Sequence, residues 1–342
     1  MSRISITGTG AVSSAGWGVE ALMVALERGV RPEASSLSRE RKNGDLVVTP
    51  VLKAPAAPPT LPKSPRLRRV SPISKFSVAA AIEALGEDRI AKVAAGELRL
   101  GVICTLLNGC VNYSNRFFGE VLADPSVASP ILFPETVFNA PSSHLSALFG
   151  STAPNDTLLG DGAEIFTGLE IATEWLLRGD CDAVLVVAAE ELDWLSAEAL
   201  ALYSRNITPS EGAAAILLEI ASGGPQLLAV PDPVALPPGA DRAMALRQAC
   251  GATGVRDDGR TLLSDSRTGA ARYDRSEDDA LAGWSGPQLS PKKILGESFA
   301  AAAGLQLVAA VEWVKSGKAD QALVAVLGGN EQAAACLIGS GS

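Results

Sequence analysis

The cysteine and histidine side chains are the first candidates for chemistry in this sequence. The five cysteines form no CxxC pair and no metal-ligand spacing, and His144 is the only histidine. A zinc site takes about four such ligands, so we expect no metal site. Cys104 and Cys110 flank the turn after an apolar run, but buried thiols are usually inert. No residue near His144 in the sequence would orient its ring, so we expect a structural role rather than general-base catalysis.

Two glycines close to the N-terminus could suggest a nucleotide cofactor. Gly8 and Gly10 follow an apolar run, yet Ser13 or Ser14 stands where the third glycine of a dinucleotide fingerprint belongs. No acidic residue follows a second strand at the required distance either. We therefore expect no cofactor.

The charge balance argues against nucleic acid as a partner. The 342 residues carry 29 basic and 38 acidic side chains, a formal net charge of −9, whereas phosphate binding needs clustered Lys and Arg. The one basic cluster, Lys63 to Arg69, lies in a Pro-rich stretch and is interpreted as a solvated loop. No segment reaches membrane-spanning length without a charge or a glycine, and scattered thiols are typical of a reducing compartment. These features predict a cytoplasmic protein that does not insert into membranes.

An internal repeat indicates the elements that must position any functional side chain. Residues 169–186 match residues 307–324 at a constant offset of 138 residues, and each copy reads as a helix, a glycine and an apolar strand. The aligned pairs include Ala172 with Ala310, Glu174 with Glu312, Trp175 with Trp313, and Gly179 with Gly317. A further apolar run follows each strand, at residues 213–220 and 333–338. The repeat predicts two related α/β halves, with mixed sheets covered by helices.

The two halves define the expected domains. We assign residues 1–222 to an N-terminal half and residues 223–342 to a C-terminal half. Strands are expected at residues 3–9 and 98–104, and helices at residues 19–28 and 74–85. Two excursions interrupt the N-terminal half: residues 35–73, rich in Pro, Ser and Arg, and residues 107–150, irregular and rich in phenylalanine.

Several segments resemble the ketoacyl synthase branch of the thiolase fold. The opening ISITGTGAVSSAGWGVEALMVAL is similar to the family's first strand, turn and helix, and FPETVFNAPSSHLSALFG to its central loop and the helix entering it. LEIATEWLLRGDCDAVLVVAAEE resembles the helix and strand that follow the nucleophile, and VLGGNEQAAACLI the closing turn and strand. SPKKILGESFAAAAGLQLVAAVEWVKSG resembles the stretch that bears the family's lysine and second histidine. The resemblance spans nearly the whole chain and implies an α/β, thiolase-like fold, in which two duplicated halves form a layered αβαβα sandwich.

The same resemblance implies that the family's catalytic residues are missing. The family's mechanism uses an acylated cysteine and two histidines. By position, Gly162 replaces the cysteine, Ser266 the first histidine and Glu297 the second. Glycine cannot be acylated, and a carboxylate would repel the developing oxyanion that a neutral imidazole stabilises. Lys292 matches the family's lysine and has two possible roles: a residual contact to an acidic substrate, or a salt bridge with Glu297 or Asp161.

An inactive chain of this kind resembles a chain-length factor, the subunit that pairs with an active ketosynthase in type II polyketide and aryl polyene systems. The resemblance implies an active ketosynthase and an acyl carrier protein as partners, in polyketide, aryl polyene or fatty acid biosynthesis. It also implies that residues 183–189 form the dimer strand and that bulky residues limit the partner's tunnel. The candidates for this, which could equally complete the chain's own core, are Phe117, Phe118, Phe133 and Phe138. The chain departs from chain-length factors in being shorter and in lacking their usual glutamine at position 162.

Two other functions are compatible with the residues. An enzyme with repurposed acyl-transfer or hydrolytic chemistry would use Asp161, Ser266 or Glu297 in the old pocket. Asp161, Glu164 and Glu297 could form a carboxylate cluster with one raised pKa, although paired or solvent-facing carboxylates are more ordinary. A homodimer that binds acyl chains without a partner enzyme is the third possibility. The lack of a nucleophile with a matching base favours the non-catalytic subunit.

Overall fold

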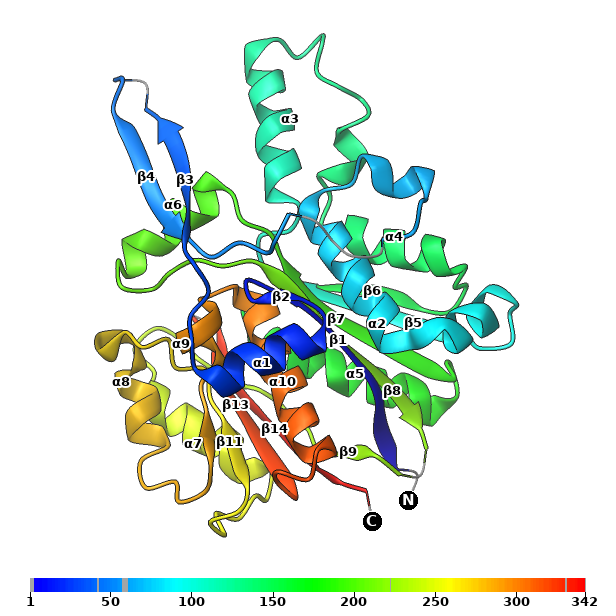
Figure 1. Cartoon of the computed structure of the whole chain (residues 1–342), viewed down its shortest axis with the longest axis vertical. Helices are drawn as coiled ribbons and strands as arrows, with labels where there is room; N and C mark the ends of the chain where they lie inside the picture. The colour runs from blue at the N-terminus through cyan, green and yellow to red at the C-terminus, as the bar shows by residue number, and fades with distance from the viewer. Residues whose placement is uncertain (1–2, 42, 57–60, 222, 330, 342) are drawn as a thin grey trace.

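One 12-stranded sheet and the helices around it build the molecule, and we call its two halves the first and the second sheet (Figure 1). The computed structural model describes residues 3–41, 43–56, 61–221, 223–329 and 331–341. The first sheet has the strand order β6 (Asn155–Leu159), β5 (Leu100–Leu106), β7 (Ala183–Glu190), β8 (Gly212–Ile220) and β1 (Ile4–Ser13). The second has the order β12 (Gln288–Leu289), β11 (Leu262–Ser264), β13 (Gln321–Leu327), β14 (Gln332–Ser340) and β9 (Pro225–Ala229).

Both sheets follow one pairing scheme. β6, β5 and β7 run parallel and β8 and β1 continue antiparallel, just as β12, β11 and β13 run parallel and β14 and β9 continue antiparallel. The repeated helix–strand unit consists of α5 (Glu164–Arg178) with β7 and of α10 (Phe299–Lys315) with β13. Gly179 and Gly317 follow the two helices in the left-handed conformation, with φ of 74° and 72°. The predicted duplication is confirmed.

The helices α5 and α10 form the middle layer, between the two sheets. Gly304 lets α10 approach the first sheet, since a Cβ there would lie 2.7 Å from the Cβ of Ala214. The outer face of the first sheet is covered by α2 (Pro72–Ala94) and α4 (Ala140–Phe149), and that of the second by α7 (Arg242–Ala252), beside which lies α8 (Ala271–Ala280). This is the predicted αβαβα sandwich, with the sheets joined where Ser5 of β1 pairs with Gln226 of β9.

The local elements expected near the N-terminus are present. β1, β5, α1 (Val19–Arg28) and α2 overlap the segments predicted as strands and helices, and α2 extends beyond its predicted range at both ends. The smaller elements are β2 (Gly16–Trp17), α6 (Trp194–Tyr203), β10 (Val234–Ala235) and α9 (Pro291–Leu295). Among the described residues, no helix combines the length and the apolar character needed to cross a membrane.

The two excursions contain more regular structure than expected. Residues 35–73 include the hairpin of β3 (Ser35–Glu40) and β4 (Leu46–Val51) and the short helix η1 (Pro65–Arg68). Residues 107–150 include α3 (Val111–Ala123), η2 (Phe133–Glu135) and α4, so the prediction of an irregular segment was wrong. Asn, Ser and Gly, which are weak helix formers, make up four of the 13 residues of α3 and lower its helix propensity. The domain boundary remains a prediction, because residue 222 lies outside the described residues.

The strand expected at the dimer contact lies inside the sheet. β7 pairs with β5 along one side and with β8 along the other, so residues 183–189 have no free edge and this prediction was wrong. The succession of helices and strands along the chain does not reveal the order of strands in the sheet. In the described part of the chain, the first sheet ends at β6, whose outer backbone groups are unpaired within the sheet.

Candidate functional site

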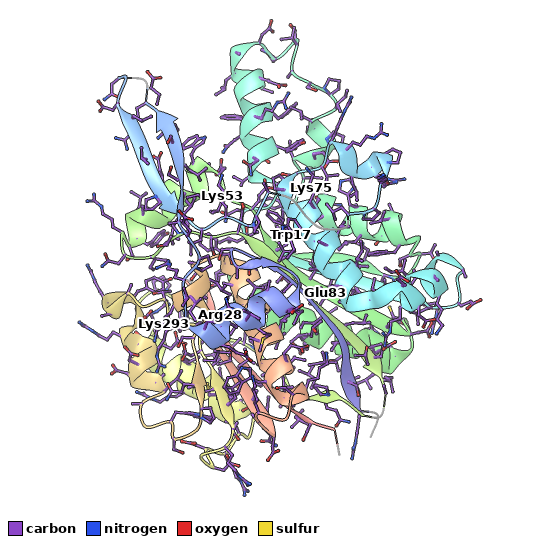
Figure 2. The ribbon with its side chains drawn as sticks, viewed as in Figure 1. Trp17, Arg28, Lys53, Lys75, Glu83 and Lys293 are labelled. Atoms are coloured by element: carbon purple, nitrogen blue, oxygen red, sulfur yellow. The ribbon has the colours of Figure 1, made fainter. Side chains whose placement is uncertain are left out.

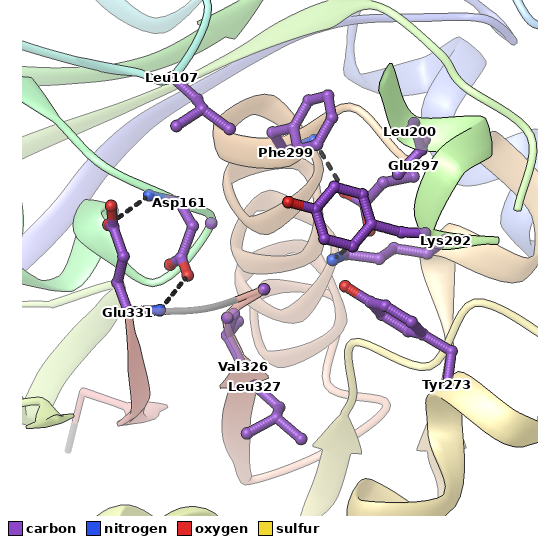
Figure 3. A pocket seen from close by; sticks show the side chains of 14 residues that line it. Leu107, Asp161, Leu200, Tyr273, Lys292, Glu297, Phe299, Val326, Leu327 and Glu331 are labelled. Atoms are coloured by element: carbon purple, nitrogen blue, oxygen red, sulfur yellow. Dashed lines mark hydrogen bonds and ion pairs between the residues drawn. The ribbon is translucent and has the colours of Figure 1, made fainter. Parts of the chain in front are cut away.

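Gly162 faces a small cavity lined by residues from both halves of the chain. The cavity has a volume of about 170 Å³. Its wall is mainly apolar and aromatic, with three carboxylates and one lysine (Figure 3). The lining residues are Leu107, Asp161, Gly162, Leu200, Tyr203, Tyr273, Lys292, Glu297, Phe299, Val326, Leu327, Gly328, Gly329 and Glu331. Three of the four positions singled out by the resemblance, 162, 292 and 297, therefore meet in one cavity.

The backbone around Gly162 leaves little room for a side chain. A Cβ on Gly162, just before α5, would lie 3.1 Å from the carbonyl oxygen of Phe299 and 3.4 Å from the Cβ of Ala303. Phe299, the first residue of α10, has a φ of 48°, a left-handed conformation that bulky residues rarely adopt. Position 162 therefore offers no group to acylate, and it lies next to the carbonyl oxygen of Phe299, a residue with a strained backbone conformation.

Lys292 and Glu297 form a buried ion pair at the side of the cavity. Nζ of Lys292 lies 2.8 Å from Oε2 of Glu297, and only 7% and 6% of the two side chains are exposed. Oε1 of Glu297 accepts a hydrogen bond of 2.8 Å from the N–H of Phe299. Burial lowers the pKa of Lys292, but the Glu297 carboxylate outweighs it and raises this pKa above its ordinary value. Of the two roles considered for Lys292, the structure shows the salt bridge, and Glu297 is its partner.

Ser266 is engaged by a buried carboxylate outside the cavity. Its N–H donates to Oε1 of Glu277 at 2.7 Å, and its hydroxyl lies 3.0 and 2.9 Å from the two carboxylate oxygens. Oγ of Ser266 also accepts from the N–H of Leu327 at 3.0 Å. Ser266 thus ties α8 to the Gly-rich turn after β13. It does not line the cavity, so its hydroxyl is not presented to a substrate there.

The carboxylates of the predicted cluster have separate partners. The N–H of Glu331 donates to Oδ2 of Asp161 at 3.2 Å, and the N–H of Asp161 donates to Oε2 of Glu331 at 3.1 Å. Glu164 accepts from Nε2 of Gln332 at 2.9 Å, and burial raises its pKa. Glu297 faces Lys292. The contacts of these carboxylates are those of structural groups that hold backbone turns beside the cavity.

The thiols and the imidazole lie away from the cavity. All five cysteines are buried, and burial raises the pKa of Cys104 to about 12, which keeps this thiol protonated. Nε2 of His144 lies 2.9 Å from Oε1 of Glu135, nine residues earlier in the chain. The expectation that nothing near His144 would orient it was therefore wrong. Glu135 is the last residue of η2 and His144 lies in α4, so the pair links these two helices.

The four candidate tunnel residues lie on or near the surface. Phe118, Phe133 and Phe138 are 61%, 56% and 45% exposed. Phe117 is half-buried, and its ring centroid lies 5.6 Å from that of Phe133. None of the four lines the cavity around Gly162. The three exposed rings are therefore not part of the chain's own core, which was the alternative considered for them.

Three residues of the site were missed by reasoning from the sequence. The ring of Tyr273 projects from α8 toward Lys292, and Phe299 points into the same space (Figure 3). Burial raises the pKa of Tyr273. Arg242 donates to the carbonyl oxygens of Gly328 and Gly329 at 2.6 and 3.0 Å and so holds the Gly-rich turn. Phe299 could have been found two residues after Glu297, whereas Tyr273 and Arg242 lie on distant helices and carry no signal.

The burial of Glu277 predicts how the stability of the folded chain depends on pH. Burial, followed by the nearby Asp265, raises the pKa of Glu277 from 4.5 to about 8. Between these values the unfolded chain ionises Glu277 while the folded chain keeps the proton, so this group's contribution to stability falls as pH rises from 4.5 to about 8. Glu277→Gln is expected to flatten that part of the stability–pH curve, measured by urea unfolding at several pH values. Glu87→Gln, at an exposed position of α2, is the control and should leave the curve unchanged. Parallel curves for the wild type and Glu277→Gln would contradict the assignment.

Comparison with known proteins places this geometry in context. The family model described as "Beta-ketoacyl synthase, N-terminal domain" matches residues 1–222. A comparison with curated proteins gives no match. Among solved structures, the chain is similar to the ishigamide ketosynthase/chain length factor, with a TM-score of 0.83 at 18% identity, covering 99% of this chain and 100% of that one. It is also similar to the ketosynthase ApeO in complex with its chain length factor ApeC from Xenorhabdus doucetiae, with a TM-score of 0.80 at 15% identity, covering 99% and 98%. At these identities the likeness shows a shared thiolase-like fold.

Proposed function

Because the chain belongs to the beta-ketoacyl synthase family, we propose that it is a non-catalytic subunit, comparable to a chain-length factor, that pairs with an active ketosynthase and shapes its acyl tunnel. The proposal depends on the residues found at the positions of the family's nucleophile and second histidine. Gly162 offers no nucleophile, and Glu297, at the second histidine position, is held by Lys292. The pathway would be type II polyketide, aryl polyene or fatty acid biosynthesis. The similar structures that contain a chain length factor support this role.

The open edge of the first sheet is the strand proposed to meet the ketosynthase. Leu159 of β6 is 52% exposed, and the remaining β6 side chains are exposed or half-buried. An exposed edge strand is a template for pairing with another chain unless it is covered. A protein that stays soluble with such an edge is expected to cover it with a partner.

A second surface supports the same partner. Within residues 118–138, large apolar side chains are 37–73% exposed, which we call the apolar surface: Phe118, Leu122, Val127, Ile131, Phe133, Val137 and Phe138. Contiguous exposed apolar side chains in a soluble protein usually mark an interaction site. We propose that this surface lies against the ketosynthase and that its rings close the end of the partner's tunnel.

The test is co-expression with the ketosynthase encoded nearest to this chain, followed by purification through a tag on this chain alone. The proposal expects a stoichiometric heterodimer that condenses malonyl units only when both chains are present. Recovery of a homodimer that binds no ketosynthase would refute it. Condensation of malonyl units by this chain alone would also refute the proposal, and would favour an enzyme with repurposed acyl-transfer chemistry.

The exposed rings make a prediction about product length. Replacing Phe118, Phe133 and Phe138 by alanine is expected to lengthen the products of the heterodimer by one or more extension units, because smaller side chains leave the tunnel open. Product masses give the readout. Stability should change by less than about 0.5 kcal/mol per substitution, because the three rings are largely exposed.

A matched variant controls for the loss of exposed apolar surface. Leu46→Ala with Val48→Ala removes side chains that are 66% and 54% exposed on the hairpin β3–β4. This variant should leave product length unchanged. Equal product lengths for the phenylalanine variant and the wild type would remove these rings from the tunnel.

A further inference from the structure

Helix α3 stands apart from the body of the molecule (Figure 1). Its first residue, Val111, is the only one that is buried, and among the described helices and strands only η2 packs extensively against it. Phe118 and Leu122, which belong to the apolar surface, are 61% and 71% exposed on α3. The position of α3 therefore depends mainly on how its N-terminal end is held.

Two adjacent buried carboxylates hold that end. Glu190, the last residue of β7, accepts hydrogen bonds from the N–H groups of Leu107 and Asn108, the second at 3.2 Å. Glu191 accepts from the N–H of Asn112, in the first turn of α3, at 2.7 Å. Because β7 is paired on both sides within the first sheet, its end is a fixed point to which α3 is fastened.

The fastened segment, residues 107–112, which we call the latch, contains a glycine hinge. Gly109 has a φ of 66°, a left-handed conformation that glycine adopts without strain. A Cβ at this position would lie 2.7 Å from Cδ1 of Phe138, so a larger residue would also clash in the observed arrangement. A turn of the backbone at Gly109 would move α3 once the hydrogen bonds to the two carboxylates are released.

The two carboxylates have no counter-charge in the described part of the chain. Each is 1% exposed, and no Lys, Arg or His side chain there lies within 4.0 Å of either carboxylate. Glu191 is also held by the Ser71 hydroxyl at 2.6 Å and by the N–H of Ile73 at 2.8 Å, whereas the hydrogen bonds of Glu190 come from the latch. Two neighbouring buried carboxylates that are both ionised repel each other and lose their hydration. One proton retained on Glu190 therefore stabilises the closed latch.

The titratable groups that face the latch from α3, η2 and α4 are neutral or already paired. Burial, followed by the charges of Glu191 and Glu135, raises the pKa of the Cys110 thiol. Burial also raises the pKa of the Tyr113 hydroxyl. Nε2 of His144 lies 2.9 Å from Oε1 of Glu135, so the imidazole is engaged by its own carboxylate. None of these groups supplies a counter-charge to the two carboxylates of the latch.

The basic side chains on the neighbouring segments act on other groups. Arg116 and Arg69 oppose the effect of burial on the pKa of Tyr113. Lys53, two residues after β4 (Figure 2), opposes the effect of burial on Glu211, whose pKa is nevertheless raised. None of these three cations forms an ion pair with a carboxylate of the latch. The protonation of Glu190 therefore controls the charge at this point.

We propose that Glu190 controls the latch through one proton: while its carboxyl group holds the proton, residues 107–112 stay fastened to the end of β7, and loss of the proton to solvent releases α3. Burial raises the pKa of Glu190 from 4.5 to about 8, and the carboxyl regains its ordinary value when the latch opens into water. Opening therefore releases one proton between pH 4.5 and about 8, so the fraction of open molecules rises with pH, by up to about tenfold per pH unit.

The latch has a consequence that rests on the proposed function. Phe118 and Leu122 move with α3, and they belong to the apolar surface proposed to meet the ketosynthase. At the acidic end of the range this part of the surface is held in one place, and at the alkaline end it is released. Pairing with the ketosynthase is therefore expected to weaken as pH rises toward 8.

Hydrogen–deuterium exchange of the purified chain, read by mass spectrometry on peptides from α3, tests the latch. Observed rates are divided by the intrinsic exchange rates at each pH, so the resulting protection factors report local opening. In the wild type, the protection of α3 is expected to fall at least about tenfold between pH 6 and pH 8. Glu190→Gln keeps a neutral side chain of the same size, and its α3 protection is expected to change less than about twofold over this range.

Three controls separate the latch from other effects of pH. Glu211→Gln removes a carboxylate that is 7% exposed and accepts from the N–H groups of Ala54 and Leu192, and it should leave the pH dependence of α3 in place. His144→Gln should do the same, because the partner of His144 is Glu135 on η2. Peptides from β7 report global unfolding, and their protection should change less than that of α3.

The wild type alone can refute the proposal, whether or not the variants fold. Constant protection of α3 between pH 6 and pH 8 would overturn the latch, as would the same pH dependence in Glu190→Gln and the wild type. Gly109→Ala should lower the protection of α3 at pH 6, because its Cβ meets Phe138 in a left-handed backbone, and unchanged protection would overturn the hinge. The exchange experiment needs no ketosynthase. Failure to co-purify with one would refute the proposed function and leave the latch as an independent result.

Discussion

Lys292→Met is expected to lower the free energy of unfolding by about 3–5 kcal/mol, because it leaves the Glu297 carboxylate buried without its counter-charge. The two groups are 2.8 Å apart, and neither side chain is more than 7% exposed. The hydrogen bond from the N–H of Phe299 to Glu297 does not replace the lost ammonium group. Urea unfolding followed by circular dichroism measures the change, with an unchanged m-value expected.

A double variant shows whether the stability is lost because the ion pair is gone or because the Glu297 carboxylate is left buried without a counter-charge. Lys292→Met with Glu297→Leu removes both charges and is expected to recover most of the stability lost in the single variant, since apolar pairs often replace buried ion pairs at little cost. The exposed pair of Lys92 and Asp88, 2.7 Å apart, gives the surface control, and Lys92→Met should lower the free energy of unfolding far less than Lys292→Met does. A small effect of Lys292→Met alone would mean that Glu297 is neutral or solvated in the folded protein.

Leu159→Pro is expected to abolish pairing with the ketosynthase while the chain itself stays folded. The N–H of Gly160 donates to Leu106, and the carbonyl of Pro154 accepts from Val102, so alternate residues of β6 face β5. By this alternation the N–H of Leu159 points to the open side of the sheet. Proline removes that donor and is tolerated in strands only at such edge positions. Co-purification with the tagged chain measures the loss of pairing.

A second substitution at the same position isolates the backbone effect. Leu159→Thr shortens the exposed side chain but keeps the N–H and a β-branched residue suited to a strand. This variant is expected to pair almost normally and to match the melting temperature of the wild type. If Leu159→Pro also pairs normally, the ketosynthase contact does not use the edge of β6.

Several features of this protein follow from local chemistry and could be read along the chain. The count of one histidine and the glycine at position 162 exclude a cysteine with two histidines, whatever the fold. The register of residues 169–186 on residues 307–324 predicted the duplication, because helix periodicity, a terminal glycine and a buried strand are all properties of short segments. The structure repeats that unit in α5 with β7 and in α10 with β13.

Contacts between distant segments depend on how the halves pack, and the sequence pattern does not contain them. Asp161 and Glu331 bind each other's backbone across 170 residues, and Oγ of Ser266 accepts a hydrogen bond from the N–H of Leu327 across 61 residues. The place of β7 inside the sheet and of β6 at its edge likewise comes from long-range pairing. Burial then decides the chemistry. Removal from water pairs Lys292 with Glu297 and raises the pKa of Glu277, whereas the same side chains in the unfolded chain would be solvated and independent.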